Sequence, residues 1–149
     1  MSLSQRIADD MKAAMKNGEK LKLETLRMVK AQFIEFAKRG PDKPVTSDDE
    51  LAIILGAIKK RKEAIDLYQQ AGRKELVDQE SRELEILKAY LPKQMESGEA
   101  DVLIQGIIKE LGASSQKDFG KVMGRSMKEL KGRMDAVIVQ ELVRKNLGA

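Results

Sequence analysis

The chain has 149 residues and a mass of 16.7 kDa, which suits one domain or two small ones. It contains neither Cys nor His, which excludes disulfides, Cys or His metal sites, Cys nucleophiles and any catalytic triad that needs an imidazole base. The net charge of +4 slightly favours anionic partners, while 3% aromatic residues are too few to stack the bases of single-stranded RNA. We expect no metal and no cofactor.

No stretch approaches the roughly 18 consecutive apolar residues of a membrane span. The longest uncharged apolar stretch, residues 51–58, is far shorter, and the N-terminal residues lack the apolar core of a signal peptide. We therefore expect a cytoplasmic protein without a membrane partner.

Glycine and proline separate a series of helical patterns, and no segment alternates with the period of a strand. The first helix is predicted to begin after Ser2 and end before Gly18, and the capping box Ser47–Glu50 predicts another helix start. The fourth helix closes at Leu91 because a residue before proline avoids the helical region. The four helices predicted in this part cover residues 3–17, 19–38, 47–72 and 73–90.

Residues 92–97 are predicted to be a linker, and three shorter helices follow it. Their predicted ranges are 99–111, 115–131 and 135–147. The sequence thus predicts an all-α protein of two small helical bundles, with about four helices in residues 1–92 and about three in residues 93–149.

The predicted helix 115–131 divides into an apolar and a basic side when its residues are placed about 100° apart. The apolar side holds Phe119, Met123, Met127 and Leu130, and the basic side holds Lys117, Lys121, Arg125 and Lys128. Lys131 and Arg133 extend the positive surface, so that residues 117–133 contain six basic and two acidic side chains. This stripe is either a solvated face or a surface that contacts the phosphates of a structured nucleic acid, which it would position without reading bases.

Gly120 and Gly124 lie together on one flank of the basic stripe. A glycine inside a helix costs about 1 kcal/mol relative to alanine, so two of them suggest a specific reason. We expect either a neighbouring helix or the backbone of a partner to approach this flank closely.

The other charged groups are weaker candidates. Residues 59–62 are all basic but point around the whole helix, and we expect Arg61 and Lys62 to cover apolar surface with their stems while their heads reach water. A cationic lip on a groove is the alternative. Glu80, Glu83 and Glu85 are expected to form solvated ion pairs rather than an acid/base pair.

No pattern resembles an active site. The segment 120–124 lacks the spacing of a phosphate-binding loop and follows no predicted strand. A serine–lysine pair between Ser126 and either Lys121 or Lys128 is formally possible.

Two stretches carry a resemblance to known proteins. The first comprises residues 61–68, Gly72-Arg73 and residues 83–94, which include the phrase Tyr90-Leu-Pro-Lys-Gln94. The second comprises residues 112–115, Asp118-Phe-Gly-Lys-Val-Met-Gly124 and Lys131-Gly-Arg133. Over essentially its whole length the sequence resembles the YqeY-like family.

Sequences similar to this family form the tail domain of the GatB component of the glutamine-dependent amidotransferase that acts on mischarged Asp- or Glu-tRNA, and are appended to some glutaminyl-tRNA synthetases. In that amidotransferase the tail contacts the tRNA body, while the chemistry lies elsewhere. The resemblance therefore implies a two-lobed all-α fold, a link to tRNA and a family label of carbon–nitrogen ligase with glutamine as amido-N-donor. Because an amidase or kinase domain is missing, we expect no catalysis by this chain alone.

The resemblance extends to individual residues near the C-terminus. The matching positions are Gly120, Lys121, Gly124, Lys131 and Gly132. Asp135 is retained, but Ala136 stands where the family usually has glycine. The missing glycine argues against a tight turn or a close backbone approach at that point.

Three hypotheses follow from the sequence. The first is a tRNA-binding or tRNA-enzyme accessory module without catalysis. The second is a protein-interaction bundle that docks on a synthetase or amidotransferase subunit through the glycine flank and Met123, Met127 and Met134. The third, an autonomous amide-transferring enzyme, is the least favoured.

Overall fold

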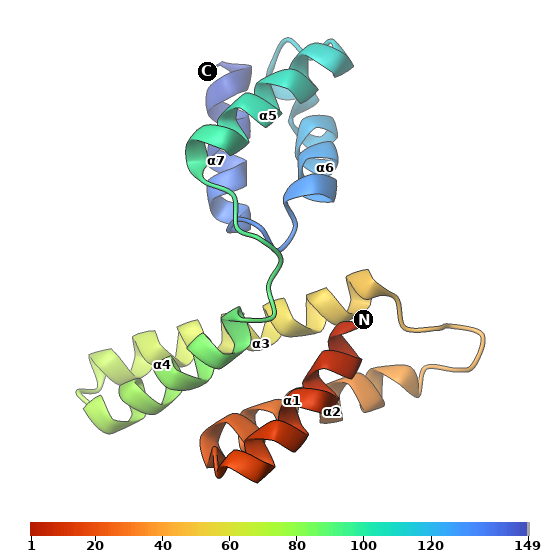
Figure 1. Ribbon diagram of the computed structural model, residues 1–149. Helices are drawn as coiled ribbons and strands as arrows, with labels where there is room; N and C mark the ends of the chain where they lie inside the picture. The colour runs from red at the N-terminus through yellow and green to blue at the C-terminus, as the bar shows by residue number, and fades with distance from the viewer. Residues whose placement is uncertain (149) are drawn as a thin grey trace. The chain divides into compact units, whose positions relative to one another are not determined.

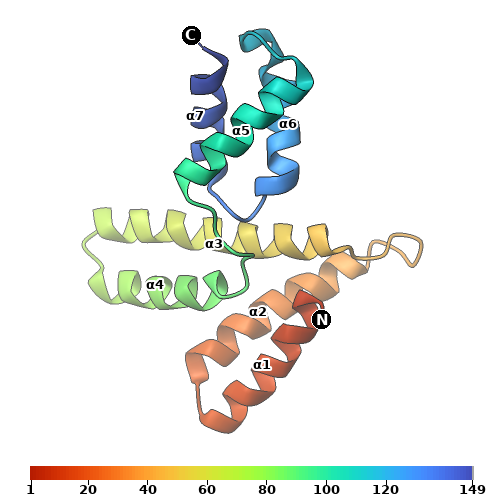
Figure 2. The ribbon, with the colours of Figure 1, turned by 45° about the horizontal axis from the view of Figure 1, so that its top comes forward.

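The computed structural model describes residues 1–148, which form seven α-helices, one short 3-10 helix and no strand (Figures 1 and 2). The all-α prediction is confirmed. By its internal contacts the chain divides into two compact units, Met1–Leu91 and Pro92–Ala149. Within residues 1–148, no helix combines the length and the apolar composition that a membrane span requires.

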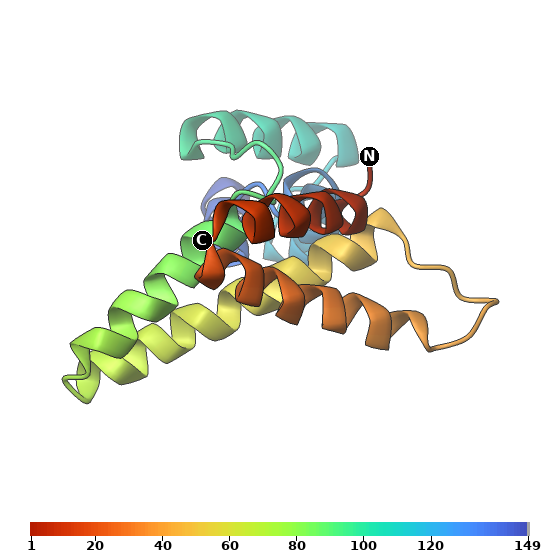
Figure 3. The same ribbon diagram turned by 60° about the horizontal axis from the view of Figure 1, so that its bottom comes forward.

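The first unit consists of two antiparallel helical hairpins. Figure 3 shows the hairpin of α1 (Leu3–Asn17) and α2 (Lys20–Ala37) crossing the hairpin of α3 (Ser47–Gln70) and α4 (Lys74–Lys88). All four helices contribute to one core, whose buried members are Ile7, Leu26, Val29, Phe33, Ile54, Ala57, Ile58, Leu84, Leu87 and Tyr90.

The start of α3 differs from its prediction by one residue. The capping residue is Thr46 rather than Ser47, because its hydroxyl accepts from the backbone N–H of Asp49 while the Asp49 carboxylate accepts from that of Thr46. Glu50 is therefore left out of the box and turns inward, where it is 6% exposed and accepts a hydrogen bond from the backbone N–H of Ser4 at 2.9 Å. A side chain expected to cap its own helix instead ties α3 to the start of α1.

The end of α4 is fixed to α1 by Tyr90. Its phenol donates a hydrogen bond to the Asp10 carboxylate at 2.5 Å, and the Arg6 guanidinium lies 4.8 Å from the ring centroid. Arg6 also donates to the backbone carbonyl of Ala89 at 3.2 Å. The tyrosine of the Tyr90-Leu-Pro phrase thus has a structural role.

The second unit contains α5 (Ser97–Leu111), the 3-10 helix η1 (Gln116–Asp118), α6 (Phe119–Leu130) and α7 (Ala136–Leu147). The three α-helices pack around one another, and the buried members of their core are Ala100, Ile104, Ile107, Val122, Leu130, Val139, Val143 and Leu147.

The segment predicted to be a linker is bonded to the turn between α6 and α7. The Gln94 side-chain amide donates to the carbonyl of Gly132 at 2.7 Å, and the backbone N–H of Met95 donates to the carbonyl of Arg133 at 2.9 Å. These bonds, together with the start of α5 at Ser97 rather than Glu99, place residues 93–97 within the structure of the second unit.

Candidate nucleic-acid interface

The helix that carries the basic stripe begins later than predicted. The Ser115 hydroxyl accepts a hydrogen bond from the backbone N–H of Lys117 at 3.3 Å, and the chain first forms η1. α6 starts only at Phe119, so the single helix predicted over residues 115–131 is wrong in its first turn. The physical reason is that a local side chain–backbone bond competes with the wider α-helical turn. Lys117 consequently precedes α6 instead of belonging to its stripe.

The buried side of α6 also differs from the predicted apolar side. The residues that are completely buried are Val122, Ser126 and Leu130, whereas three residues of the predicted apolar side are only half-buried. Those three are Phe119, Met123 and Met127. Both α5 and α7 pack against α6, and a helix with two neighbours buries most deeply the strip of residues that lies between them. Which residues of α6 are buried therefore depends on where the neighbouring helices pack and not on hydropathy alone. For this reason a serine can occupy the centre of the buried side.

Three of the predicted stripe cations are exposed: Lys117, Lys121 and Lys128. None of them forms an ion pair with another residue of the described chain, 1–148. Lys121 and Lys128 lie on the side of α6 away from its buried residues, since 100° steps place them about 140° and 160° from Ser126, the middle of the three. The structure thus leaves unpaired positive charge on this face.

Arg125 is paired within the protein. Its guanidinium lies 3.3 and 3.4 Å from the two carboxylate oxygens of Glu110 on α5, with the two side chains 37% and 60% exposed. An ion pair this exposed contributes about 0.2–1 kcal/mol, so a phosphate can replace the Glu110 carboxylate at small cost.

Lys131 and Arg133 are half-buried, so they extend the positive surface less than the sequence suggested. The Arg133 side chain donates from Nε to the carbonyl of Lys93 at 3.1 Å, which gives it a structural role. Gly132 between them is buried and has a φ of +77°, a left-handed conformation that costs other residues about 1–2 kcal/mol. This backbone conformation explains why glycine occupies position 132.

Gly120 and Gly124 have a different environment. A Cβ atom added to either would meet no heavy atom within 4 Å, and both residues are exposed. Hence no helix of the described chain approaches this flank closely, and the first of the two expected explanations is wrong. The close approach of a partner stays a prediction.

The departure from the family pattern at Ala136 leaves no strain. Ala136 is the first residue of α7, and no non-glycine residue among 1–148 has a positive φ. Asp135 caps the helix as expected, with its carboxylate accepting from the backbone N–H of Val137 at 2.8 Å.

The possible serine–lysine pair is absent from α6. Ser126 is completely buried and its Oγ has no hydrogen-bond partner among residues 1–148, whereas Lys121 and Lys128 are exposed to solvent. Among residues 1–148 no group of three or more acidic side chains could hold a metal ion.

Two predictions for the first unit are wrong because its helices cross. The Arg61 head does not reach water: the side chain is 6% exposed and donates to the Ala57 carbonyl at 3.2 Å and to the Met28 sulfur at 3.8 Å. Glu83 is half-buried rather than solvated, and burial, followed by the neighbouring Glu80 carboxylate, raises its pKa. Of the three glutamates, Glu85 alone forms an ion pair of the expected kind within residues 1–148, at 3.4 Å from Lys88.

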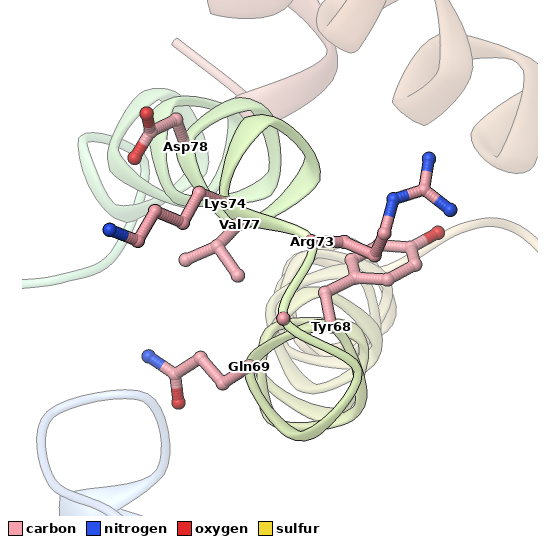
Figure 4. A pocket seen from close by; sticks show the side chains of 7 residues that line it. Tyr68, Gln69, Arg73, Lys74, Val77 and Asp78 are labelled. Carbon is pink, nitrogen blue, oxygen red and sulfur yellow. The ribbon is translucent and has the colours of Figure 1, made fainter.

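A hollow of about 330 Å³ lies at the turn between α3 and α4 (Figure 4). Tyr68 and Arg73 point to one side of this hairpin, while Gln69 and Val77 point to the other (Figure 4). Arg73 is already paired with Glu75 at 2.8 Å. Because these side chains do not converge on one point, the hollow is a weaker candidate for binding than the α6 face.

Comparison with known proteins identifies a family and several relatives of this chain. The sequence profile described as "Yqey-like protein" matches residues 4–147. "Altered inheritance of mitochondria protein 41, mitochondrial" from Pyrenophora tritici-repentis is 33% identical over 149 residues, which cover 97% of this chain and 80% of that protein.

Two further relatives match over shorter segments. "Uncharacterized protein C22F3.15" from Schizosaccharomyces pombe is 36% identical over 81 residues, or 54% of this chain and 64% of that protein. A glutamyl-tRNA(Gln) amidotransferase subunit from Methanocaldococcus jannaschii is 36% identical over 67 residues, or 42% of this chain and 11% of that protein. This chain is thus similar to one small part of an amidotransferase subunit.

Proposed function

Because the chain belongs to the YqeY-like protein family, we propose that it is an accessory module that binds tRNA and performs no catalysis of its own, as the tail of a tRNA amidotransferase subunit would. The observation that carries the proposal is the α6 face, where Lys121 and Lys128 are exposed and unpaired within residues 1–148, with Lys117 just before the helix. The similarity to a segment of a glutamyl-tRNA(Gln) amidotransferase subunit supports tRNA as the RNA.

Binding of this kind acts on phosphates. Each phosphate neutralised by a lysine or arginine releases counterions and adds about −0.7 to −0.9 to the slope of log K against log salt. Lys117, Lys121, Lys128 and a freed Arg125 would together give a slope of about −3. The aromatic ring of this region is not free for base stacking, because the Arg144 guanidinium lies 5.1 Å from the Phe119 centroid. The surface would therefore position a structured RNA without reading its bases.

The test is a titration of bulk tRNA with the full-length protein at several salt concentrations. Charge reversal of Lys121, Arg125 and Lys128 to Glu should weaken binding and reduce the steepness of the salt dependence by about 2–3. The matched control is reversal of Lys59, Lys60 and Lys62 on α3, of which the described structure shows none in an ion pair. An affinity that ignores salt, or that survives the α6 reversal, would reject the proposal.

A second candidate function is docking on a synthetase or amidotransferase subunit. It is favoured by the open flank at Gly120 and Gly124 and by two exposed apolar side chains of α7, Val137 at 60% and Ile138 at 40%. The methionines expected to form this surface are half-buried and pack against the core of the second unit; they are Met123, Met127 and Met134. Gly124→Trp should then abolish capture of such a subunit in a binding assay with purified proteins, while circular dichroism shows an intact fold. Unchanged capture would exclude this flank as the docking surface.

We also propose that the protein acts in the cytoplasm, as its sequence suggested. Fractionation of cells that express the native chain tests the location. The relative from Pyrenophora tritici-repentis has "mitochondrial" in its name, so recovery in an organelle fraction is the contrary outcome.

A further inference from the structure

A second segment of the chain has the same excess of positive charge as the α6 region. Residues 12–30 contain six basic side chains and two acidic ones, as residues 117–133 do. The rest of the chain contains 16 basic and 20 acidic residues. The overall charge of +4 therefore hides two cationic segments, one in each unit, on a background that is slightly acidic.

The cations of residues 12–30 lie at the end of the α1–α2 hairpin and along α2. Lys12 and Lys16 are one helical turn apart on the side of α1 away from its buried residues, and Gly18, with a φ of +69°, closes a tight turn that brings the chain to Lys20. The exposed cations of this surface are Lys12, Lys16, Lys20, Arg27 and Lys30. None of the five forms an ion pair with another of residues 1–148.

The start of α2 adds to this positive potential. Its first turn contains no acidic residue, and no side chain of the described residues forms a capping hydrogen bond at its N-terminus. The Glu19 carboxylate at the N-cap position accepts a hydrogen bond from the Asn17 side chain at 3.3 Å and offsets part of this positive charge. Lys20 and Lys22 thus stand at the positive end of the helix dipole, an arrangement that destabilises the free protein and favours a bound anion.

The surface lacks the features that other anionic partners need. A membrane-binding helix requires a free apolar face, but the apolar face of α1 is buried in the core of its unit through Ile7 and Ala14. The exposed large apolar side chains of residues 12–30 are Met15, at 61%, and Met28, which contacts Arg61. A protein interface would need a cluster of apolar anchors, whereas dispersed phosphates require only cations.

We propose that the end of the α1–α2 hairpin is a second RNA-binding surface, where Lys12, Lys16 and Lys20 contact the phosphate backbone. This inference rests on the proposed tRNA-binding function and adds a site in the first unit. It predicts that the total salt dependence of tRNA binding exceeds what the α6 cations alone can supply.

The test compares three full-length triple variants with bulk tRNA as the probe. The hairpin variant carries Lys12→Glu, Lys16→Glu and Lys20→Glu, the α6 variant reverses Lys121, Arg125 and Lys128, and the control variant reverses Lys59, Lys60 and Lys62. The hairpin variant should bind tRNA about tenfold or more weakly at moderate salt, with a salt slope shallower by about 2–3, while the control stays close to wild type.

The outcomes separate the two proposals. Normal binding by the hairpin variant, with loss in the α6 variant, overturns this inference and leaves the proposed function intact. Normal binding by both variants removes both proposals. An equal loss in the control variant shows a response to net charge alone and also overturns the inference. Binding of the wild type, but not the hairpin variant, to vesicles containing phosphatidylglycerol, with tRNA binding unaffected in both, assigns the surface to a membrane instead.

The single substitution Lys20→Glu guards against misfolding as an explanation. It places an acidic residue in the first turn of α2, which the helix dipole favours, but also four residues before Glu24, which it repels, so the thermal unfolding midpoint should stay close to that of wild type while tRNA binding weakens. A variant that is as stable as wild type and yet binds less cannot owe its loss to unfolding. An unchanged affinity in this variant would argue that Lys20 does not contact RNA.

Discussion

Substitution of Gly124 by alanine tests the unusual glycine flank of α6. Gly124 has no positive φ and lies inside the helix, so alanine can adopt its conformation without strain. Apart from the backbone of α6 itself, a Cβ atom there would meet no heavy atom of the described chain within 4 Å, so no repacking is needed. The substitution should therefore stabilise the second unit by the full difference in helix propensity, about 0.8–1 kcal/mol. For a unit of this size that corresponds to a rise of about 4–8 °C in the unfolding midpoint.

Gly132→Ala provides the matched control, because the same chemical change should have the opposite effect there. Gly132 has a φ of +77°, so a Cβ atom is expected to cost about 1–2 kcal/mol. Calorimetry and urea unfolding of the full chain, followed by hydrogen exchange in α6, would measure both variants. Destabilisation by Gly124→Ala would refute the reasoning, since it would reveal a close contact on this flank. Stabilisation combined with weaker binding of tRNA or of a protein partner would show that Gly124 is kept for function.

Three further predictions concern buried or half-buried polar groups. Ser126→Ala removes a buried hydroxyl that has no hydrogen-bond partner in the described part of the chain, and it should raise the free energy of unfolding by about 1 kcal/mol or more, as measured by urea unfolding. A loss of stability would mean that the hydroxyl has a partner. Glu50→Ala removes the acceptor of the Ser4 backbone N–H and should cost about 1.5–3 kcal/mol, seen as a lower urea midpoint at constant m; an unchanged midpoint would contradict it. Because burial raises the pKa of Glu83, its ionised form destabilises the folded state, and the contribution of the protonated form is lost as pH rises through the raised pKa. The free energy of unfolding of Glu83→Gln should thus exceed that of wild type at pH 7 and equal it below pH about 4. A lower free energy of unfolding at pH 7 would show that Arg61 needs the charge of Glu83.

Many of the helix ends could be predicted from a few neighbouring residues. Ser2 accepts a hydrogen bond from the backbone of Gln5, and Gly18 and Gly112 end their helices in the left-handed conformation, as their positions in the sequence indicated. Where two neighbouring residues could both cap a helix, the predicted capping residue was wrong by one position. Thr46 rather than Ser47 caps α3, because the carboxylate that completes the box belongs to Asp49.

The candidate site could be predicted only in part. Periodicity indicated correctly that Lys121 and Lys128 face outward. It could not show that Glu110, 15 residues before Arg125, pairs with it, because that contact requires α5 and α6 to be packed together. The excess of positive charge in residues 12–30 can be counted from the sequence. The proposal that this segment binds RNA, however, depends on most of its cations being exposed and unpaired in the described structure.

The sequence by itself determined the helical class, the approximate helix ends and the family, because capping bonds, glycine turns and apolar periodicity act over a few residues. Only the tertiary structure decided which charged groups stay free. Glu50 reaches the N–H of Ser4 across 46 residues, and Arg61 reaches Met28 across 33, in contacts that exist only once the two hairpins cross. Most cations of α6 and of the α1–α2 hairpin become candidates for binding because packing leaves them in solvent and, Arg125 excepted, without an ion pair among residues 1–148, a condition that local sequence cannot specify.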